Sequence, residues 1–465
     1  MPVIPEQASA LQSATEKMRA AGVPQRAIDV FAYYYGELVE GATGMIPEDS
    51  VASLTDVAHA DEEVRKYVGT DTARTAAGQT VVIKLNGGLG TTMGLDRAKS
   101  LVPVRDGLSF LDVIATQVNH VRATLDVALP IVFMNSFATH DDTMAAIAKH
   151  DLAVGDLPLA FLQNQEPKLL VDDLTPVSWP ADPRLEWCPP GHGDLYTALE
   201  TSGVLQTLLN AGFRYATVSN SDNLGAVPDP AMMAWFAATG APCAMEVCRR
   251  TAADVKGGQL VVRRSDGRLV LRETAQTPPD DAKFAADIDR HRYFNTNSLW
   301  FDLEQVAAAL ADRDGVLGLP LIRNIKTVDP TDPSSPKVVQ IESAMGAAIE
   351  VFEGAVALEV DRSRFRPVKS TDDLLVLRSD VYEFGRDGVV QSIAEPPLVR
   401  LDPRYYKAIA DFEARVPVAP SLREANSFTV EGDWWLGSGV VVSGDVRLQD
   451  EGPGQHVPDG TRLLG

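Results

Sequence analysis

Cysteine is scarce in this sequence, and its spacing shows no pairing. The 465 residues include three cysteines, Cys188, Cys243 and Cys248. An odd count without a CxxC motif argues against both a disulfide framework and a zinc site. We therefore expect three small side chains that are simply buried.

Long apolar runs are also missing. No window approaches the ~18 consecutive apolar residues that span a bilayer. The first residues, MPVIPEQASALQSATEKMRAAG, lack the apolar segment of a secretory signal. Together with the unpaired cysteines, these absences predict a cytoplasmic protein.

Basic side chains are outnumbered by acidic ones. The sequence has 42 Lys and Arg residues against 64 Asp and Glu residues, a net charge of −22. That charge repels nucleic-acid backbones and anionic membranes. We expect neither as a partner, and any anionic ligand must be bound by a local group of residues. The 45% hydrophobic and 23% charged residues are otherwise ordinary for a globular protein.

The length predicts more than one domain, because a chain of 465 residues exceeds what one core usually fills. The first ~75 residues are expected to be helical, since apolar side chains recur at spacings of three and four. These side chains are Leu11, Ala14 and Met18, followed by Phe31, Tyr34, Tyr35 and Leu38.

From Thr80 onward, short apolar runs alternate with helical patterns. This alternation predicts a mostly parallel sheet with helices on both faces. The runs are TVVIKL at 80, PIVFMN at 130, PLAFLQ at 158, YATVSN at 215 and CAMEVC at 243. A loop at 328–337, VDPTDPSSPK, interrupts the pattern without ending the domain, because apolar runs resume after it.

Two further segments predict sheet structure of another kind. The runs QLVVRR and RLVLRE flank Ser265–Gly267, which favours an antiparallel hairpin. Near the C-terminus, VEGD at 430 is echoed by VSGD twelve residues later, at 442. Twelve residues equal two hexads, the spacing of a small β-helix, with an antiparallel meander as the alternative.

The glycine-rich stretch LNGGLGTTMG at 85–94 follows an apolar strand. Glycines at such a junction let backbone N–H groups approach a phosphate closely. Gly88, Gly90 and Gly94 are spaced one residue too widely for a dinucleotide fingerprint, and no GK[ST] follows for a P-loop. A tight turn without a ligand is the alternative. Lys99, just beyond the loop, favours a phosphate site because it can neutralise charge on a transferring phosphoryl group.

Two loops carry candidate polar groups. In PPGHGD at 189–194, His192 is a general base, a sugar-hydroxyl partner or only a loop histidine, and the spacing leaves all three open. In SNSDNLG at 219–225, Asp222 follows an apolar run at the end of a strand, where ligands of open α/β sheets bind. A carboxylate there can hold Mg²⁺ against substrate phosphates, or it can close an Asx turn.

Two later motifs complete the set. In FNTNSLWFDL at 294–303, Asn295 and Asn297 share one side of an extended backbone, which suits sugar hydroxyls as well as turn formation. The stretch RSRFRPVKSTDDL at 362–374 gathers basic side chains in an acidic chain. It is either a solvated basic loop or the source of a second phosphate-neutralising lysine, Lys369.

Taken in order, these motifs resemble the UTP:glucose-1-phosphate uridylyltransferases of eukaryotic type, also called UDP-glucose pyrophosphorylases. The resemblance runs from about Val81 to Lys369. It implies an α/β fold in three parts: a helical N-terminal region over 1–75, a nucleotidyltransferase domain with a Rossmann-like mixed sheet over 76–385, and a linker with a short left-handed β-helix over 386–465. The motifs are KLNGGLGTTMG, KSLVPVRDGLSFLD, PPGHGDLY, SNSDNLGA, NTNSLW, QIESAMGAAIE and SRFRPVKSTDDLL.

The resemblance also implies the reaction, a Mg²⁺-dependent attack of a glucose 1-phosphate oxygen on the α-phosphorus of UTP, with pyrophosphate leaving. Carried over motif by motif, the catalytic groups are Lys99, Lys369 and Asp222, of which Asp222 holds the metal. The nucleotide contacts are Leu85, Asn86, Gly87, Gly88, Gln163 and Gly191. The sugar or phosphate contacts are His192, Asn220, Glu273, Asn295 and Asn297.

Some points stay open at this stage. Ala98 stands where the family usually has a proline, Gln165 competes with Gln163 for the uracil contact, and the tail ending at Gly465 leaves the oligomeric state open. One alternative is a UDP-N-acetylhexosamine or broad-specificity UDP-sugar pyrophosphorylase, although that sister group typically has asparagine in place of His192. Another is a non-catalytic UDP-sugar sensor, which has little need for two phosphate-directed lysines.

Overall fold

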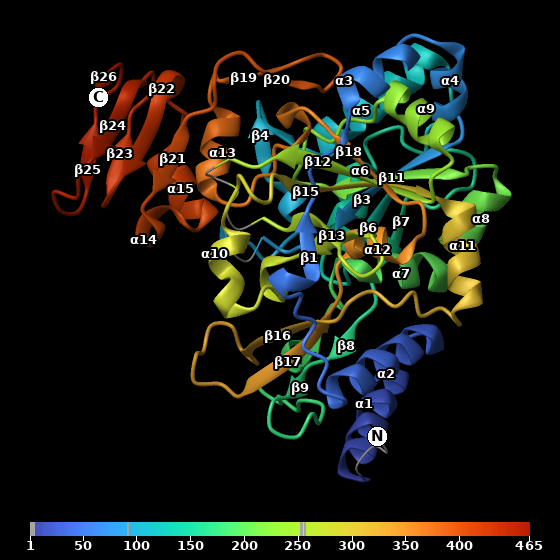
Figure 1. Cartoon of the computed structure of the whole chain (residues 1–465). Coiled ribbons are helices and arrows are strands. Elements are labelled where there is room, and N and C mark those ends of the chain that lie inside the picture. Colours follow the sequence, from blue (N-terminus) through green and yellow to red (C-terminus); the bar gives the residue numbers. More distant parts are fainter. Residues whose placement is uncertain (1–4, 91–92, 252–253, 255–256) are drawn as a thin grey trace.

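The structure, a computed structural model, describes residues 5–90, 93–251, 254 and 257–465. It is a mixed α/β protein built around one large central sheet (Figure 1). Within the described residues, no helix combines the length and the apolar character needed to cross a membrane. Cys188, Cys243 and Cys248 are all free and buried, as their sequence context predicted.

The central sheet is mainly parallel, with one antiparallel strand in its middle. Its main path runs β2-β18-β12-β15-β11-β3-β6-β7, and β15 is antiparallel to both of its neighbours. The five apolar runs expected to form strands are β3, β6, β7, β11 and β12 of this sheet. The bounds are β2(Ala58–His59), β18(Val356–Glu359), β12(Cys243–Arg249), β15(Tyr293–Asp302), β11(Tyr215–Asn220), β3(Thr80–Asn86), β6(Ile131–Asn135) and β7(Ala160–Leu162).

Helices cover both faces of the sheet because successive strand residues point to opposite sides. In β3, Val82 packs into the core with α4, α5, α6 and α9. Val81 and Ile83 pack into the opposite core with α7, α8, α11 and α12. The bounds are α4(Asp71–Ala77), α5(Phe110–Leu125), α6(His140–Ile147), α9(Pro230–Thr239), α7(Leu195–Thr201), α8(Val204–Asn210), α11(Leu303–Asp312) and α12(Ala348–Val351).

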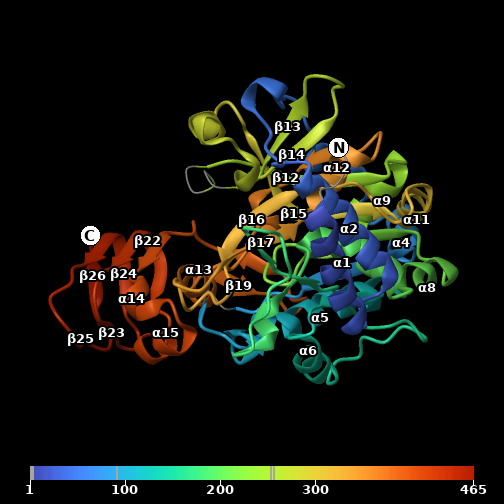
Figure 2. The same cartoon turned by 90° about the horizontal axis from the view of Figure 1, so that it is seen from below.

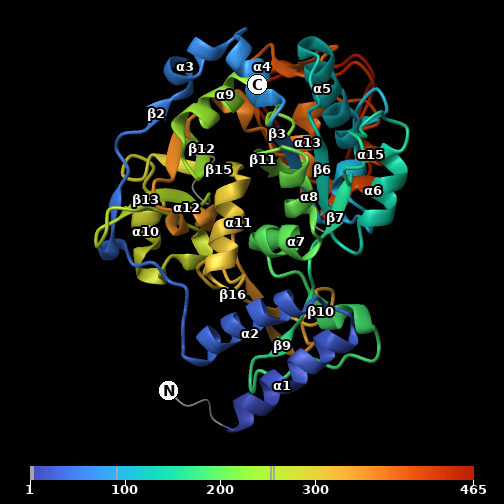
Figure 3. The same cartoon turned by 90° about the vertical axis from the view of Figure 1, so that its right-hand side faces the viewer.

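The N-terminal region is helical at first but not throughout. The helices α1(Pro5–Ala20) and α2(Gln25–Val39) bury Met18, Phe31 and Tyr35 against a small sheet of β16(Ile322–Thr327), β17(Lys337–Glu342) and β9(Leu169–Leu170) (Figures 2 and 3). The expected helical run to residue 75 is interrupted, because β1(Val51–Ser53) and β2 join the central sheet before α3(Ala60–Glu63).

The predicted antiparallel hairpin is present. The strands β13(Gln259–Arg263) and β14(Leu269–Arg272) pair through a turn in which Gly267 has φ +73°, and they extend the central sheet through β15. Smaller pairs are β8(Glu166–Pro167) with β10(Trp187–Cys188), β4(Pro103–Arg105) with β5(Leu108–Ser109), and β19(Tyr382–Phe384) with β20(Val390–Ser392).

The C-terminal strands form a parallel stack, not an antiparallel meander (Figure 1). Ser421 pairs with Val441, and Val441 with Arg462, so successive turns of the chain are 20 and 21 residues apart. The twelve-residue echo of VEGD in VSGD is therefore not the register, since Val430 lies opposite Leu448. The strands are β21(Leu398–Leu401), β22(Ser421–Val430), β24(Val441–Leu448) and β26(Arg462–Leu464), with β23(Trp434–Leu436) paired to β25(Gln455–Val457).

Short helical segments complete the described chain. The remaining α-helices are α10(Ala282–Ala285), α13(Thr371–Arg378), α14(Pro403–Tyr406) and α15(Ile409–Arg415). The 3₁₀ segments used below are η4(Lys99–Leu101), η6(His192–Asp194), η10(Met345–Ala347) and η11(Arg362–Arg364), and the others are η1(Glu48–Ser50), η2(Arg65–Tyr67), η5(Pro183–Glu186), η8(Thr274–Gln276) and η9(Pro279–Asp281).

Candidate functional site

The candidate site lies at one edge of the central sheet. The strands β3, β6, β7 and β11 are parallel, so their carboxyl ends reach the same edge. The strand β15 runs the other way, so its first residues start at that edge. Asn220 at the end of β11 and Asn295 near the start of β15 therefore come together although 75 residues separate them. Ligands of open α/β sheets bind at such an edge.

The glycine-rich loop leaves β3 at this edge and returns to its own start. The backbone N–H of Lys99 donates to the carbonyl of Gly88 at 3.4 Å, and Leu89 forms an antiparallel bridge with Ala98. Two residues of the motif, Thr91 and Thr92, lie outside the described residues. The loop therefore places the start of η4, and with it Lys99, directly beside Gly88.

Asn86, predicted to contact the nucleotide, turns its side chain into the protein. Its Nδ2 donates to Asn135 and to Thr143, both at 2.8 Å, and its Oδ1 accepts from the hydroxyl of Ser100. The residue is only 4% exposed. The neighbouring Leu85 holds the Asp222 loop through its backbone, since its carbonyl accepts from the N–H of Ser221 at 3.0 Å. The side chain of Asn86 thus fastens β3 to β6, α6 and η4.

Lys99 and Asp222 meet at the centre of the edge. Lys99 Nζ donates to Asp222 Oδ2 at 2.7 Å, and both side chains are about four-fifths buried, at 17% and 20% exposure. The second carboxylate oxygen, Oδ1, is buried and has no hydrogen-bond partner among the described residues. A buried oxygen without a partner is costly unless a ligand satisfies it. Asp222 therefore has one oxygen free to bind a cation.

The segment that carries Lys369 is docked onto the Asp222 loop. The N–H of Val368 donates to the carbonyl of Asp222 at 3.2 Å, and the N–H of Arg366 donates to Asn223 Oδ1 at 2.8 Å. Asn223 Nδ2 in turn donates to the carbonyl of Arg364 at 3.0 Å. These contacts hold the two loops together and bring Lys369 to the same edge.

Lys369 itself is exposed, and its backbone N–H is held by Asp373 Oδ2 at 2.7 Å. The predicted sugar ligand Glu273 faces it electrostatically. Burial raises the pKa of the Glu273 carboxyl, and the Lys369 ammonium offsets part of that rise. A Cβ at Gly258 would lie 2.6 Å from Glu273 Oε2, so this carboxylate rests against bare backbone.

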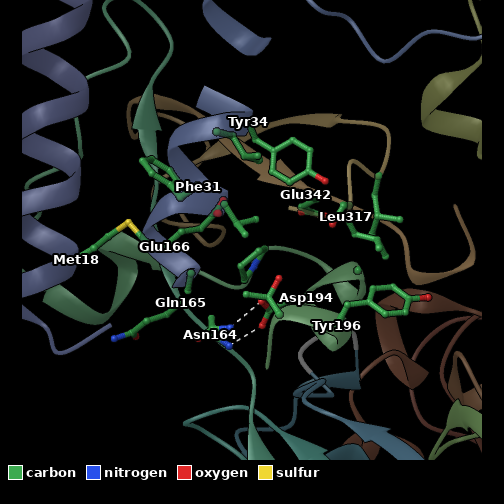
Figure 4. A pocket seen from close by; sticks show the side chains of 18 residues that line it. Met18, Phe31, Tyr34, Asn164, Gln165, Glu166, Asp194, Tyr196, Leu317 and Glu342 are labelled. Atoms are coloured by element: carbon green, nitrogen blue, oxygen red, sulfur yellow. Dashed lines mark hydrogen bonds between the residues drawn. The ribbon is translucent and has the colours of Figure 1, made fainter. Parts of the chain in front are cut away.

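Three of the residues predicted to contact the nucleotide lie together. Gln163 Nε2 donates to the carbonyl of Gly191 at 2.8 Å, and a Cβ at Gly87 would lie 2.8 Å from Gln163 Oε1. Gln165 lines a separate cavity, behind this group, that faces α1 and α2 (Figure 4). Of the two candidate glutamines, Gln163 is therefore the one beside the glycine-rich loop.

His192 is held in a defined state by the QIESAMG segment. Its Nδ1 accepts the N–H of Met345 at 2.9 Å, so the proton of the neutral ring sits on Nε2. Burial lowers the pKa of His192 to about 4. The ring is consequently a neutral donor at physiological pH. Gly191 and Gly193 allow the approach, because a Cβ at either would lie within 2.5 Å of Ser343 atoms.

The predicted amide cluster is assembled. Asn295 Nδ2 donates to Asn297 Oδ1 at 3.2 Å, and Asn297 Nδ2 contacts Asn220 Oδ1 at 3.5 Å. Asn297 has φ +60°, a left-handed conformation that Asn tolerates better than most residues. The strained backbone turns the amide toward Asn220 and away from the alternating pattern expected of a strand.

Sequence reasoning missed a buried ionic group behind the Asp222 loop. Lys84 is fully buried, and its Nζ donates to Ser219 Oγ at 2.8 Å and to the carbonyl of Ala226 at 3.1 Å. Burial lowers the pKa of Lys84 to about 7, and the positive charge of Arg364 adds to the effect. Lysine within an otherwise apolar strand was the signal, since an unpaired lysine is almost never buried.

Comparison with known proteins follows the same pattern. A profile of the family described as UTP–glucose-1-phosphate uridylyltransferase matches residues 28–443. The UTP–glucose-1-phosphate uridylyltransferase of Astragalus penduliflorus is 40% identical over 388 residues, covering 82% of this chain and 80% of that protein. The enzyme of Solanum tuberosum is 40% identical over 387 residues, covering 82% and 79%.

Solved structures match over nearly the whole chain. A UDP-glucose pyrophosphorylase variant from Leishmania major in complex with UDP-glucose is 40% identical, with a TM-score of 0.90 and 98% of each chain covered. A UDP-glucose phosphorylase from Trypanosoma brucei is also 40% identical, with a TM-score of 0.88, and the match covers 98% of this chain and 100% of that chain.

Proposed function

This chain belongs to the UTP–glucose-1-phosphate uridylyltransferase family, and from that premise we propose how its residues carry out the reaction. It is a nucleotidyltransferase that joins UTP and glucose 1-phosphate and releases pyrophosphate. We propose that both substrates bind at the edge of the central sheet described above. The observation that carries this assignment is the convergence of Lys99 and Asp222, at 2.7 Å, beside the glycine-rich loop.

The uridine is proposed to bind on the side of the glycine-rich loop. Gly87, Gly88, Gln163 and Gly191 surround that position, and the backbone of Leu85 forms its floor. Glycine at 87 and 191 is required by the close approach of neighbouring atoms, as a Cβ would lie 2.8 Å from Gln163 Oε1 and 2.5 Å from the Ser343 carbonyl oxygen. Asn86 is proposed to act through the backbone it holds, because its side chain is already fully bonded.

The glucosyl group is proposed to bind among Asn220, Asn295 and Asn297, with Glu273 at one side and His192 Nε2–H as a donor. Neutral amides and a neutral imidazole suit hydroxyl groups, which need both donors and acceptors. His192 is assigned to binding and not to proton transfer, since the attacking phosphate oxygen is already ionised and needs no general base.

The residues at the centre handle charge. Lys99 and Lys369 approach the phosphates from two different segments and stabilise the negative charge that develops on the departing pyrophosphate. Positioning both phosphates in line supplies the rest of the rate enhancement.

Magnesium fits the residues present. Asp222 offers a buried oxygen without a partner. Within the described part of the chain, no group of three or more His, Cys, Asp or Glu side chains forms a metal cage. Mg²⁺ typically binds through one or two carboxylates together with substrate phosphates and water. We propose that Asp222 holds the ion, which would supply positive charge to the UTP phosphates when bound.

We also propose finer points of architecture. The 20- and 21-residue register of the C-terminal strands supports a left-handed β-helix over 386–465. The parallel strands β3, β6 and β11 with flanking helices support a Rossmann-like domain over 76–385, and α1 and α2 support a separate N-terminal region over 1–75.

The test is pyrophosphate release from UTP with a panel of sugar 1-phosphates, with and without Mg²⁺. The proposal predicts the highest kcat/KM for glucose 1-phosphate and no turnover after chelation. Higher efficiency with N-acetylglucosamine 1-phosphate would favour a UDP-N-acetylhexosamine pyrophosphorylase. Binding of UDP-glucose without turnover under any condition would favour a UDP-sugar sensor.

A further inference from the structure

A buried pair of polar side chains cross-links the two segments that carry the proposed uracil contacts. Asp194 Oδ2 accepts the backbone N–H of Asn164 at 2.6 Å, and Oδ1 accepts Asn164 Nδ2 at 2.8 Å (Figure 4). Asp194 is 5% exposed and Asn164 is 9% exposed. Such a buried two-point contact between an anion and amide donors fixes both distance and orientation.

The pair stands directly next to the site. Asn164 follows Gln163 in the chain, and Asp194 follows Gly193 two residues after His192. On the site side, the same two segments are joined only through Gln163 Nε2, which donates to the Gly191 carbonyl at 2.8 Å, among the contacts described between them. The position of the Gln163 amide relative to Gly191 thus depends on the cross-link behind it.

The surroundings offer no substitute for the Asp194 carboxylate. The pair borders a small cavity of about 30 Å³ that is also lined by Phe31, Tyr34, Glu166 and Glu342 (Figure 4). Glu166 is 3% exposed, and its Oε1 has no partner in the described structure. Its carboxyl is therefore not engaged with Asn164, and donors released by a change at Asp194 would stay unsatisfied.

We propose that Asp194 and Asn164 are a positioning pair that sets the spacing of Gln163 and Gly191 and thereby the discrimination between uracil and cytosine. Neither side chain touches the substrate. Uracil presents N3–H and a 4-carbonyl where cytosine presents an N3 acceptor and a 4-amino group, so a reader built of one amide and one backbone unit must be held in register to tell them apart. This inference rests on the proposed placement of uridine beside Gln163.

The first experiment is Asp194→Asn, which replaces an acceptor oxygen by an N–H group facing the Asn164 donors. We expect KM for UTP to rise about 10-fold and the UTP-to-CTP ratio of kcat/KM to fall about 10-fold, the size of effect typical of an unsatisfied buried hydrogen bond. We expect kcat with UTP to change less than about 3-fold and KM for glucose 1-phosphate to stay unchanged, because the charge-handling residues are not involved.

The second experiment exchanges the two groups. In the double variant Asn164→Asp/Asp194→Asn, the new amide at position 194 donates to the new carboxylate at position 164 and its oxygen accepts the backbone N–H of that residue. The pairing is thus rebuilt with opposite polarity. We expect KM and the UTP-to-CTP ratio to return to within about 3-fold of wild type. Asn164→Asp alone, which sets two carboxylates against each other, should be at least as damaging as Asp194→Asn.

The control is Asp173→Asn, in an exposed turn where the carboxylate accepts the backbone N–H of Thr175 at 2.9 Å. It should leave KM and the ratio unchanged. UTP affinity is measured by calorimetry as well as by turnover, so a failure of the proposed reaction in the wild type is distinguished from a failure of the pair.

Two results would overturn the inference. One is wild-type UTP affinity and wild-type discrimination in Asp194→Asn. The other is an exchange variant that regains the wild-type Tm but not UTP affinity or discrimination, which would mean that the pair serves stability alone.

Discussion

His192 is a neutral hydrogen-bond donor because two features of its surroundings agree. The N–H of Met345 occupies Nδ1, and burial lowers the pKa to about 4. A lowered pKa means that the ring gains its proton only as the pH falls through about 4, whereas an unperturbed histidine gains it near 6.5. Across the range from pH 5.5 to 9, its charge does not change.

We predict that His192→Asn lowers kcat/KM for glucose 1-phosphate about 10- to 100-fold, as expected when a buried donor to a charged or hydroxyl group is lost. The asparagine oxygen can still accept the Met345 N–H. The pH profiles of kcat/KM for the wild type and the variant should run parallel from pH 5.5 to 9. A wild-type inflection between pH 6 and 7 that disappears in the variant would instead require His192 to exchange a proton during turnover.

Ala98 adopts the backbone conformation of the residue it replaces. Its φ is −55° and its ψ is 127°, within the range that a proline ring imposes. In the bridge between Leu89 and Ala98, the hydrogen bonds are made by the flanking residues, because the N–H of Gly90 reaches the Arg97 carbonyl and the N–H of Lys99 reaches the Gly88 carbonyl. The loop does not need the ring to reach its shape.

We therefore predict that Ala98→Pro raises the free energy of unfolding by about 0.4–1 kcal/mol, because proline narrows the unfolded ensemble without straining the fold. KM for UTP should stay within about 2-fold of wild type. Urea unfolding and initial rates measure both, and Ala98→Gly, which loosens the unfolded chain, should shift stability the other way by roughly 0.5–1 kcal/mol. A destabilised Ala98→Pro protein would contradict this view of the loop.

At the residue scale, motif order predicted which charged and amide side chains meet, and strand geometry decided how each one points. Lys99 and Asp222 pair as expected for a common site. Asn86 could not be placed from the motif, because a polar residue at a strand end faces either the ligand or the core, and here Asn135 and Thr143 bind it. Asp194 looked like one more loop residue, since nothing in the sequence reveals Asn164 as its partner.

At the scale of elements, the Asp222 loop and the Lys369 segment act as one unit. Asn223 and Pro367 form a bridge, and Gly225 lies where η11 crosses it. A Cβ at Gly225 would lie 2.4 Å from the Ser363 carbonyl oxygen and 2.8 Å from the Arg364 carbonyl carbon. Contact that close leaves no room for any other side chain.

We predict that Gly225→Ala pushes the Lys369 segment away from Asp222, lowers kcat by about 10-fold or more and costs about 1–3 kcal/mol of stability through overpacking. The matched control is Gly36→Ala in α2, where no atom lies within 4 Å of the new Cβ. The control should be stabilised by about 0.5–1 kcal/mol, because alanine favours helix more than glycine does. Unfolding curves and initial rates separate the two, and an active, stable Gly225→Ala enzyme would show that the loops move independently.

The strands of the main sheet were predictable because their apolar runs are buried on both faces. The direction of β15 was not, since an apolar run carries no direction, yet that reversal brings Asn295 and Asn297 to the site. The strands β1 and β2 were missed because they have three and two residues, too few to show a period. The tail was expected to repeat at twelve residues, but its pairing is set by whole turns of 20 and 21 residues.

At the scale of the whole molecule, groups from remote segments supply the chemistry. Lys99, Asp222 and Lys369 come from three parts of the chain, and the sheet edge and the bridge between Asn223 and Pro367 bring them together. The net charge of −22 makes this local gathering of lysines necessary for the binding of anionic substrates. The central claim is that Asp222 holds the ion that these substrates require.

The most direct test is a Mg²⁺ titration of pyrophosphate release by the wild type and by Asp222→Asn. Asp229→Asn serves as the control, since Asp229 caps α9 seven residues later and asparagine caps equally well. We predict a fall in kcat/KM of about 100-fold or more for Asp222→Asn at a magnesium concentration that saturates the wild type, the loss typical of one preorganised electrostatic group. The half-saturating Mg²⁺ concentration should rise, while the Asp229→Asn control follows the wild-type curve. An Asp222→Asn enzyme with the wild-type dependence on Mg²⁺ would contradict the account.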